Sequence, residues 1–499
     1  MRIWLLPSLI ALLAAGAAER PNILLILTDD QGWPTLGCYG GSIVPTPNLD
    51  RLAANGARFT NAYVTSQCTP TRATLLTGQY TARHGLWHVL SWYGYPRARV
   101  TEPMFPENYS RNTFTIAKGL QKAGYRTAIV GKWHLTSNAD GNYMGINPKA
   151  AQHYGFDYAP PILSRKYFEP GADRGVDRLT DQALEFIGRN KQRPWFCLLS
   201  HHMIHGVVVA PKKLEDKYRR LGYGDEGPNR AVYLAGLEHI DHSVGRIMDR
   251  LNELGMWKNT LVLFLSDNGG IWRRLGFKEL PRPNPETPEF QPDLVEYNNA
   301  PLREGKGSIY EGGVRVPFIA SLPGRFKSGI TIDTPVHAID ILPTCFQLAN
   351  VRSPKDHPLD GRSLVKLLSK GADPGLGDRP LFQYYPFYDL RWGLTPSASI
   401  RLGDYKLIEF FGDRVGPDMK YDPSSRLELY HLRTDIGESK NLATRLPRLA
   451  GTMKQRLRDW MQDIGAEVPV LNKHHDPAEA FVETRKKPEW LKDVKWTPN

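Results

Sequence analysis

The chain has 499 residues, a hydrophobic content of 41% and a formal net charge of +12 at pH 7. This length suits a large α/β core with a smaller module, and four cysteines exclude a disulfide-rich scaffold. The basic charge is compatible with a solvated surface or with a polyanionic partner, and no nucleic-acid motif accompanies it.

Residues 1–18 predict a secretory signal peptide. Arg2 supplies a positive charge, residues 3–15 are almost entirely apolar, and Ala15-Gly16-Ala17 offers a small-residue cleavage site. The apolar stretch is short for a bilayer span, and no later segment has the length that a span needs. We therefore expect a secreted or periplasmic protein without a membrane span.

The first strand is expected at residues 22–28, a continuous apolar run. Along the chain, helices are expected near 47–56, 70–78, 115–122 and 233–254, and further strands at 125–130, 195–200 and 260–266. This alternation predicts an α/β catalytic domain over residues 19–375, with a large mixed, mostly parallel sheet sandwiched by helices.

The pattern changes after residue 375. Residues 399–410 and 427–432 predict antiparallel strands, and residues 446–464 predict a terminal helix followed by a polar tail. We expect a smaller C-terminal α+β subdomain over residues 376–499.

Carboxylates follow two of the predicted buried strands. Asp29 and Asp30 come directly after residues 22–28, and Asp267 and Asn268 come directly after residues 260–266. Ligands bind beyond the carboxyl ends of strands in open α/β sheets, and like charges gathered there need a cation between them. Each pair alone is an ordinary turn sequence. Together their hard oxygens favour Ca²⁺, or Mg²⁺, over Zn²⁺.

The run from Cys68 to Gly78 reads C-T-P-T-R-A-T-L-L-T-G. Pro70 and Gly78 favour a short helix, which would put Cys68 at a helix N-terminus where free N–H groups attract anions. The alternative is a small buried core cysteine, which the polar neighbours of Cys68 disfavour.

Basic side chains follow other strands. Lys132 and His134 lie in G-K-W-H after residues 125–130, and at i and i+2 they share one face of an extended segment. Three histidines, at 201, 202 and 205, follow residues 195–200, and Lys306 lies in L-R-E-G-K-G-S-I-Y-E-G-G-V-R-V-P. Taken singly, each is an ordinary rim, packing or loop residue.

These motifs together resemble the type I, formylglycine-dependent sulfatases of the alkaline phosphatase superfamily, with arylsulfatase- and N-acetylgalactosamine-6-sulfatase-like character. The resemblance covers nearly the whole mature chain. It implies an alkaline-phosphatase-like fold and a maturation enzyme that converts Cys68 to formylglycine, whose hydrate is the nucleophile. It also implies a calcium ion, with these ligands: Asp29, Asp30, Asp267, Asn268 and the modified Cys68.

The resemblance also implies roles for the basic residues. Arg72, Lys132 and Lys306 would surround the sulfate, and His134 would act as a base. His205, or Lys306, would protonate the leaving oxygen. We prefer His205 over His201 and His202, although the family usually has Thr-Pro after this histidine and the present chain has Gly206-Val207.

The expected function is hydrolysis of a sulfate ester, with a sulfated carbohydrate as the substrate. One alternative is a phosphodiester or phosphonate monoester hydrolase of the same superfamily. Another is a non-catalytic binder of sulfated glycans, if Cys68 is unmodified. Two aromatic groups, around Trp87 to Tyr93 and at residues 384–392, would either stack on sugar rings or pack in the core. Disulfide pairing among Cys38, Cys197 and Cys345 stays open.

Overall fold

The computed structural model describes residues 20–90, 94–225, 229–272, 299–412, 414–415, 421–422, 426–480 and 482–484. The expected signal peptide and the end of the polar tail lie outside these ranges. A mixed seven-stranded sheet forms the centre, in the order β10-β2-β9-β8-β1-β7-β4. Its strands are β1 (Asn22–Thr28), β2 (Ala57–Phe59), β4 (Arg126–Gly131), β7 (Trp195–Ser200), β8 (Thr260–Ser266), β9 (Phe318–Ser321) and β10 (Ile330–Ile332).

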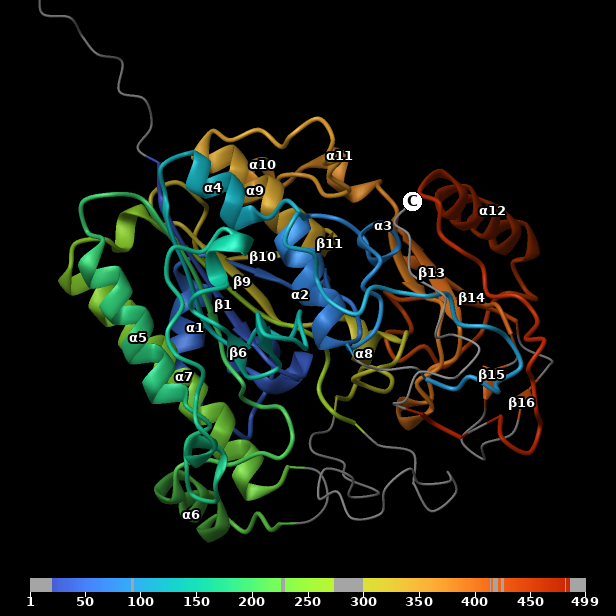
Figure 1. The fold of residues 1–499 in the computed structure, drawn as a ribbon, viewed down its shortest axis with the longest axis horizontal. Helices are drawn as coiled ribbons and strands as arrows, with labels where there is room; N and C mark the ends of the chain where they lie inside the picture. Colours follow the sequence, from blue (N-terminus) through green and yellow to red (C-terminus); the bar gives the residue numbers. More distant parts are fainter. Residues whose placement is uncertain are drawn as a thin grey trace, which may run out of the picture.

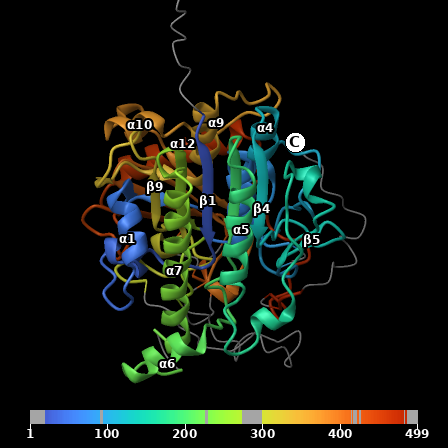
Figure 2. The same cartoon turned by 90° about the vertical axis from the view of Figure 1, so that its left-hand side faces the viewer.

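Most neighbouring strands of this sheet are parallel, and β9 runs antiparallel to both β8 and β2. Helices cover both faces (Figures 1 and 2). Leu24 and Ile26 of β1 pack in the same cluster as α1 (Pro47–Ala54), α5 (Val176–Arg189) and α7 (Ala231–Glu253). The alternate residues of β1 pack with α2 (Cys68–Thr77), α4 (Ile116–Lys122) and α9 (Ile341–Ala349). The predicted sandwich is therefore confirmed.

A second, antiparallel sheet lies beside the first, in the order β12-β13-β14-β17 (Figure 1). It comprises β12 (Leu381–Tyr385), β13 (Ser397–Leu402), β14 (Tyr405–Phe410) and β17 (Leu427–His431), with α12 (Pro447–Asp463) packed on it. The single strand expected at 399–410 is wrong. Leu402 pairs with Tyr405 across a two-residue turn that contains Gly403 at φ 57°, so the segment is a hairpin. A domain division at residue 375 remains a prediction.

Shorter elements connect these layers. The helices are α3 (Thr81–His84), α6 (Lys212–Arg220), α8 (Glu311–Val314), α10 (Val365–Lys370) and α11 (Pro374–Gly377). The short strands are β3 (Ala62–Tyr63), β5 (Gly141–Asn142), β6 (Gly145–Ile146), β11 (Val336–His337), β15 (Arg414–Val415) and β16 (Tyr421–Asp422). Single 3-10 turns occur at Trp33–Thr35, Gly37–Tyr39, Ala151–Tyr154, Arg165–Phe168, Trp257–Asn259, Ala338–Asp340 and Leu390–Trp392.

Bonding and burial bear on the cysteines and the aromatic groups. All four cysteines are free thiols. Trp87 and residues 384, 385, 387 and 388 are buried in the core, whereas Trp92 and Tyr93 lie outside the described residues. Within the described ranges, no helix combines the length and apolar character needed to cross a bilayer.

Candidate active site at the carboxyl rim of the sheet

Four adjacent parallel strands end at one rim of the central sheet. Leu27 of β1 pairs with Ser200 of β7, Gly131 of β4 also pairs with Ser200, and Thr28 pairs with Ser266 of β8. The residues that follow these strands therefore converge, as expected for the carboxyl edge of an α/β sheet.

Three acidic and three basic side chains form one-to-one ion pairs at this rim. The pairs are Asp29 with Lys132 at 2.5 Å, Asp30 with Lys306 at 2.7 Å, and Asp267 with Arg72 at 2.6 Å. None of the six residues is more than 7% exposed. The formal charges of the three pairs sum to zero. A bound cation together with a bound anion of equal charge would therefore leave the site neutral.

Asn268 tests whether the site fits a metal. Its Nδ2 donates to Asp30 Oδ1 at 2.8 Å, while its Oδ1 is buried and has no hydrogen-bond partner. A buried acceptor without a partner is costly unless another group binds it. An amide oxygen beside three buried carboxylates suits a hard cation such as Ca²⁺ or Mg²⁺, so the donor set fits a metal.

Cys68 is the first residue of α2, which begins two residues before the predicted start at Pro70, so Cys68 lies at the helix N-terminus. Its Sγ lies 3.4 Å from Asp29 Oδ1 and 3.6 Å from Lys306 Nζ, and the residue is 1% exposed. Burial, reinforced by the charge of Asp267, raises the pKa of the thiol. Since a protonated thiol is a poor nucleophile, the unmodified side chain is not activated here.

The three histidines after β7 occupy different surroundings. His205 Nε2 lies 3.9 Å from Asp30 Oδ2, and its side chain is 30% exposed. His201 Nε2 lies 3.4 Å from Ser243 Oγ, and the His202 ring packs on Phe168. His205 is thus placed beside the acidic cluster. Burial and the charge of Lys306 hold the pKa of His205 well below its usual value.

His134 also lies at the rim. Its carbonyl accepts from Thr69 Oγ1 at 2.8 Å, and its Nδ1 is buried without a hydrogen-bond partner. Burial and the charge of Lys132 hold the pKa of His134 well below its usual value, which leaves the imidazole neutral. Asp30 and His134 both have left-handed backbones, at φ 60° and 58°, a strain that is typical of functional sites.

Backbone packing explains the glycines of two motifs. A Cβ on Gly269 would lie 1.7 Å from the carbonyl oxygen of Gly312. A side chain at position 269 would therefore collide with this backbone segment. Gly269 N donates to Gly313 O at 2.9 Å, and Lys306 N donates to Gly270 O at 2.9 Å. The loop of Asp267 and the loop of Lys306 are therefore joined main chain to main chain.

Sequence reasoning missed several neighbours of the candidate residues. Ser200 Oγ accepts from Arg72 Nη1 at 2.5 Å, and its position at the end of β7 could have indicated this. The Trp392 ring lies 5.9 Å from Lys306 Nζ, and Asp389 accepts from Gln67 Nε2 at 2.7 Å. Both come from the C-terminal part. Trp392 belongs to the aromatic group noted at residues 384–392, but its position beside Lys306 was not predicted, and no motif marks Asp389.

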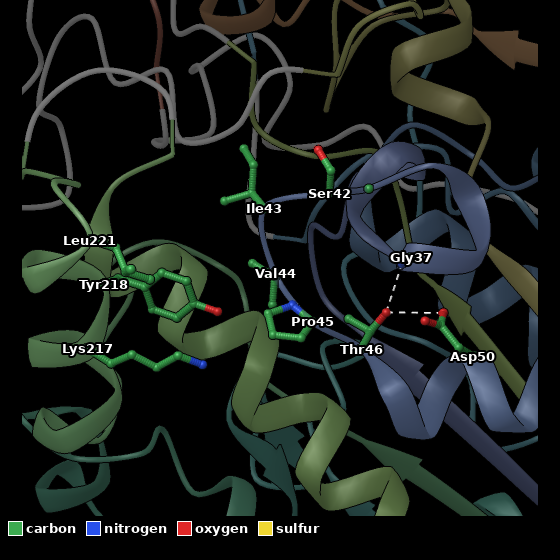
Figure 3. A pocket seen from close by; sticks show the side chains of 11 residues that line it. Gly37, Ser42, Ile43, Val44, Pro45, Thr46, Asp50, Lys217, Tyr218 and Leu221 are labelled. Carbon is green, nitrogen blue, oxygen red and sulfur yellow. Dashed lines mark hydrogen bonds between the residues drawn. The ribbon is translucent and has the colours of Figure 1, made fainter.

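A surface hollow of about 380 Å³ lies apart from these residues (Figure 3). Lys217 and Tyr218 of α6 face the segment 42–46 across it (Figure 3). Its lining consists of Gly37, residues 41–46, Asp50, Lys217, Tyr218 and Leu221. None of the candidate rim residues belongs to that lining, so the hollow does not extend the candidate site.

Comparisons with known proteins agree with this geometry. Residues 21–351 match the family model described as Sulfatase, and residues 305–463 match that of N-sulphoglucosamine sulphohydrolase, C-terminal. The chain is 32% identical to human arylsulfatase A, covering 90% of this chain and 89% of the relative. It is 30% identical to a sulfatase of Formosa agariphila, covering 89% of both.

The fold is similar to that of Ps i-CgsB, solved in complex with k-i-k-neocarrahexaose. The TM-score is 0.69 at 23% identity, over 92% of this chain and 96% of the other. This likeness confirms the α/β architecture. Because the family model spans most of the chain and relatives match along almost its whole length, the protein belongs to the sulfatase family of sulfuric ester hydrolases.

Proposed function

We propose that this protein is an exported sulfatase that removes sulfate from a sulfated carbohydrate, using formylglycine at position 68 and a calcium ion. The observation that carries the proposal is the position of the Cys68 side chain, 3.4 Å from Asp29 and 3.6 Å from Lys306. The net charge of +12 supports attraction to a polyanionic substrate.

Four residues would hold the metal: Asp29, Asp30, Asp267 and Asn268. When bound, the metal supplies positive charge to sulfate oxygens, and formylglycine supplies a hydrated aldehyde as the nucleophile. Because the acids would turn toward the metal, their three basic partners would become available for the sulfate. Arg72, Lys132 and Lys306 would then hold the sulfate oxygens and stabilise the charge that shifts during transfer.

The proton steps fall to the histidines and the lysine of the rim. His134, kept neutral by burial and Lys132, would accept a proton from a hydroxyl at position 68. Burial opposes the charge on Lys306, but Asp30 together with its neighbours Cys68 and Asp29 outweighs burial and raises the pKa of Lys306. Lys306 and His205 both lie beside Asp30, and either would protonate the leaving oxygen. Lys306 carries its proton already, whereas His205, whose pKa is held low, would need the negative charge of the bound sulfate to become protonated.

Two measurements test the proposal. Peptide mass analysis of active protein should find formylglycine at position 68, and a panel of defined sulfated mono- and oligosaccharides should release free sulfate. An aryl phosphodiester and an aryl phosphonate serve as competing substrates, and the sulfate ester should be turned over fastest. An active preparation that carries only cysteine at position 68 would reject the mechanism. An intact thiol without turnover would favour a glycan-binding protein.

A further inference from the structure

A second group of potential metal ligands lies where α5 begins beside α7 (Figure 2). Asp173 precedes α5, Asp177 lies in its first turn, and His239 projects from α7. His239 Nε2 lies 3.8 Å from Asp173 Oδ2 and 3.6 Å from Asp177 Oδ2. One ligand atom from each of the three residues falls within 4.8 Å of the others.

His239 is the observation that distinguishes this group from an ordinary acidic surface. Its side chain is 10% exposed, and its Nε2 is buried with no hydrogen-bond partner. Both carboxylate oxygens are too far away for a hydrogen bond. Two ligands of one tetrahedral ion, each bonded at about 2.0–2.2 Å, lie roughly 3.3–3.6 Å apart, close to the spacing found here.

The existing contacts of Asp173 and Asp177 hold both carboxylates in place and leave room for a metal ion beside them. Asp173 accepts from the backbone amides of Gly175 at 3.0 Å and Asp177 at 2.8 Å, which fixes it at the start of α5. Arg246 pairs with Asp177 Oδ1 at 3.0 Å, while Asp177 Oδ2 lies nearest His239. The side chain of Asp177 is 56% exposed, so an ion in solution can reach the group.

We propose that Asp173, Asp177 and His239 form a second divalent-metal site, suited to a borderline first-row ion such as Zn²⁺. An imidazole nitrogen with two carboxylate oxygens matches zinc ligation with a fourth position left for water. The four ligands proposed at the rim are oxygens, which suit a harder ion, although Cys68 and His205 also lie within reach there. This proposal concerns residues outside the rim and goes beyond the proposed hydrolysis.

The site would steady the loop that carries His205. Arg174 follows Asp173 directly and has a left-handed backbone at φ 53°. Its Nε donates to the carbonyl oxygen of His202 at 2.9 Å, and its Nη1 donates to that of Val207. An ion that ties the start of α5 to α7 would therefore fix the residue that holds both ends of the 202–207 segment.

Zinc titration of the full chain, with Ca²⁺ in excess to occupy the rim site, tests the proposal. Calorimetry and metal analysis should find one tightly held Zn²⁺ per wild-type chain. His239→Gln should weaken this binding by at least about tenfold, because it removes the only nitrogen donor of the group. His242→Gln is the matched control, since His242 lies on the same helix, is 50% exposed and is outside the group. It should bind zinc as wild type does.

Asp177→Asn provides a second variant at an exposed position that is expected to fold normally, and it should also lose zinc affinity. Hydrogen exchange at residues 202–207 should slow when zinc binds to wild type or His242→Gln, and should not change in Asp177→Asn. No retained zinc in wild type, or equal affinity in wild type, His239→Gln and Asp177→Asn, would overturn the site and leave an ordinary ion pair. Zinc binding without slower exchange would overturn the link to the His205 loop.

Discussion

Two buried ionic clusters in this molecule differ in what they leave unpaired. The seam cluster, which we define as Glu311, Lys406 and Glu438, joins α8 to the C-terminal sheet. Lys406 Nζ lies 3.1 Å from Glu311, 2.9 Å from Glu438 and 2.9 Å from the carbonyl oxygen of Ile309, so all three of its protons have acceptors. At the rim, by contrast, Asn268 Oδ1 has no partner. Buried charge alone therefore does not mark a ligand site. At the seam the cation already lies beside both carboxylates, whereas at the rim an amide oxygen without a partner lies beside the acidic side chains.

The electrostatics of the two clusters are otherwise alike. At the rim, burial opposes ionisation of Asp29, but Lys132 and its neighbours hold the pKa well below its usual value. Burial and the charge of Asp29 raise the pKa of Asp267 to about 6. At the seam, burial raises the pKa of Glu438 to about 7. Burial also opposes ionisation of Glu311, but Lys406, Arg315 and Arg401 together outweigh it and lower the pKa of Glu311 to about 2.

The largest expected effect is on catalysis at the rim. Cys68→Ala should lower turnover of nitrophenyl sulfate by a factor on the order of 10⁴–10⁶, because the nucleophile is lost, with little change in melting temperature. Cys197→Ala, at another buried free thiol, is the control and should keep its turnover. Comparable turnover in Cys68→Ala and wild type would refute the assignment of the nucleophile.

The seam should respond in stability instead. Lys406→Ala removes the shared cation from two buried carboxylates and should lower the free energy of unfolding by about 3–5 kcal/mol. Denaturant unfolding measures this change. Turnover per folded molecule should stay near the wild-type value, because Lys406 is not at the rim. A seam variant that lost turnover but kept its free energy of unfolding would contradict the distinction between a catalytic rim and a structural seam.

Division of labour within the rim gives the next effect. His205→Ala should damage turnover of a sugar sulfate about 10²–10⁴-fold more than that of nitrophenyl sulfate, since nitrophenolate leaves without a proton. Lys132→Ala should damage both substrates alike, because both present the same sulfate. Steady-state kinetics on the two substrates measure the gap. Equal losses in His205→Ala would transfer the acid role to Lys306.

Removal of the metal should affect the rim cluster and leave the seam cluster unchanged. Exhaustive chelation should abolish most activity and lower the melting temperature, and added Ca²⁺ should restore both. At a free ion concentration of 100 times Kd the binding contributes about 2.7 kcal/mol to stability. Asp267→Ala should lose this dependence on Ca²⁺, and Lys406→Ala should keep it. Full activity in chelated, metal-free protein would contradict the site.

The most gradual effect is a pH dependence at the seam. The folded pKa of Glu438, about 7, lies above the usual 4.5, so the folded chain binds more protons than the unfolded chain between those values. Stability should therefore fall as pH rises from about 4.5 to about 7, by up to about 1.4 kcal/mol per pH unit. Glu438→Gln should flatten this slope. Unchanged slopes in the variant would place the titration elsewhere.

The strands that consist of one unbroken apolar run were predicted best from the sequence. Strands β1, β7 and β8 have the predicted bounds because each is an unbroken apolar run between polar residues. The hairpin of β13 and β14 looked like one strand because its turn is only two residues long. The strands β2, β9 and β10, which lie together at one side of the sheet, have three or four residues each, too few for a periodic signal.

The candidate site divides in the same way. Asp29, Lys132 and Asp267 were predictable as neighbours because each follows a strand that ends at the same rim. Their pairing was not, since which acid meets which base depends on side-chain geometry. Asp389 and Trp392 lie more than 300 positions after Cys68 in the chain, and only the packing of the second sheet brings them near.

The burial of α2 limits the stage at which Cys68 can be modified. All ten residues from Cys68 to Thr77 are buried, so a maturation enzyme has no access to the C-T-P-T-R segment of the folded chain. The proposed conversion of Cys68 would then have to occur while the chain is still unfolded. The active fraction of a preparation would be set by a race between folding and modification. Molecules that fold before Cys68 is modified would have the native fold but would stay inactive.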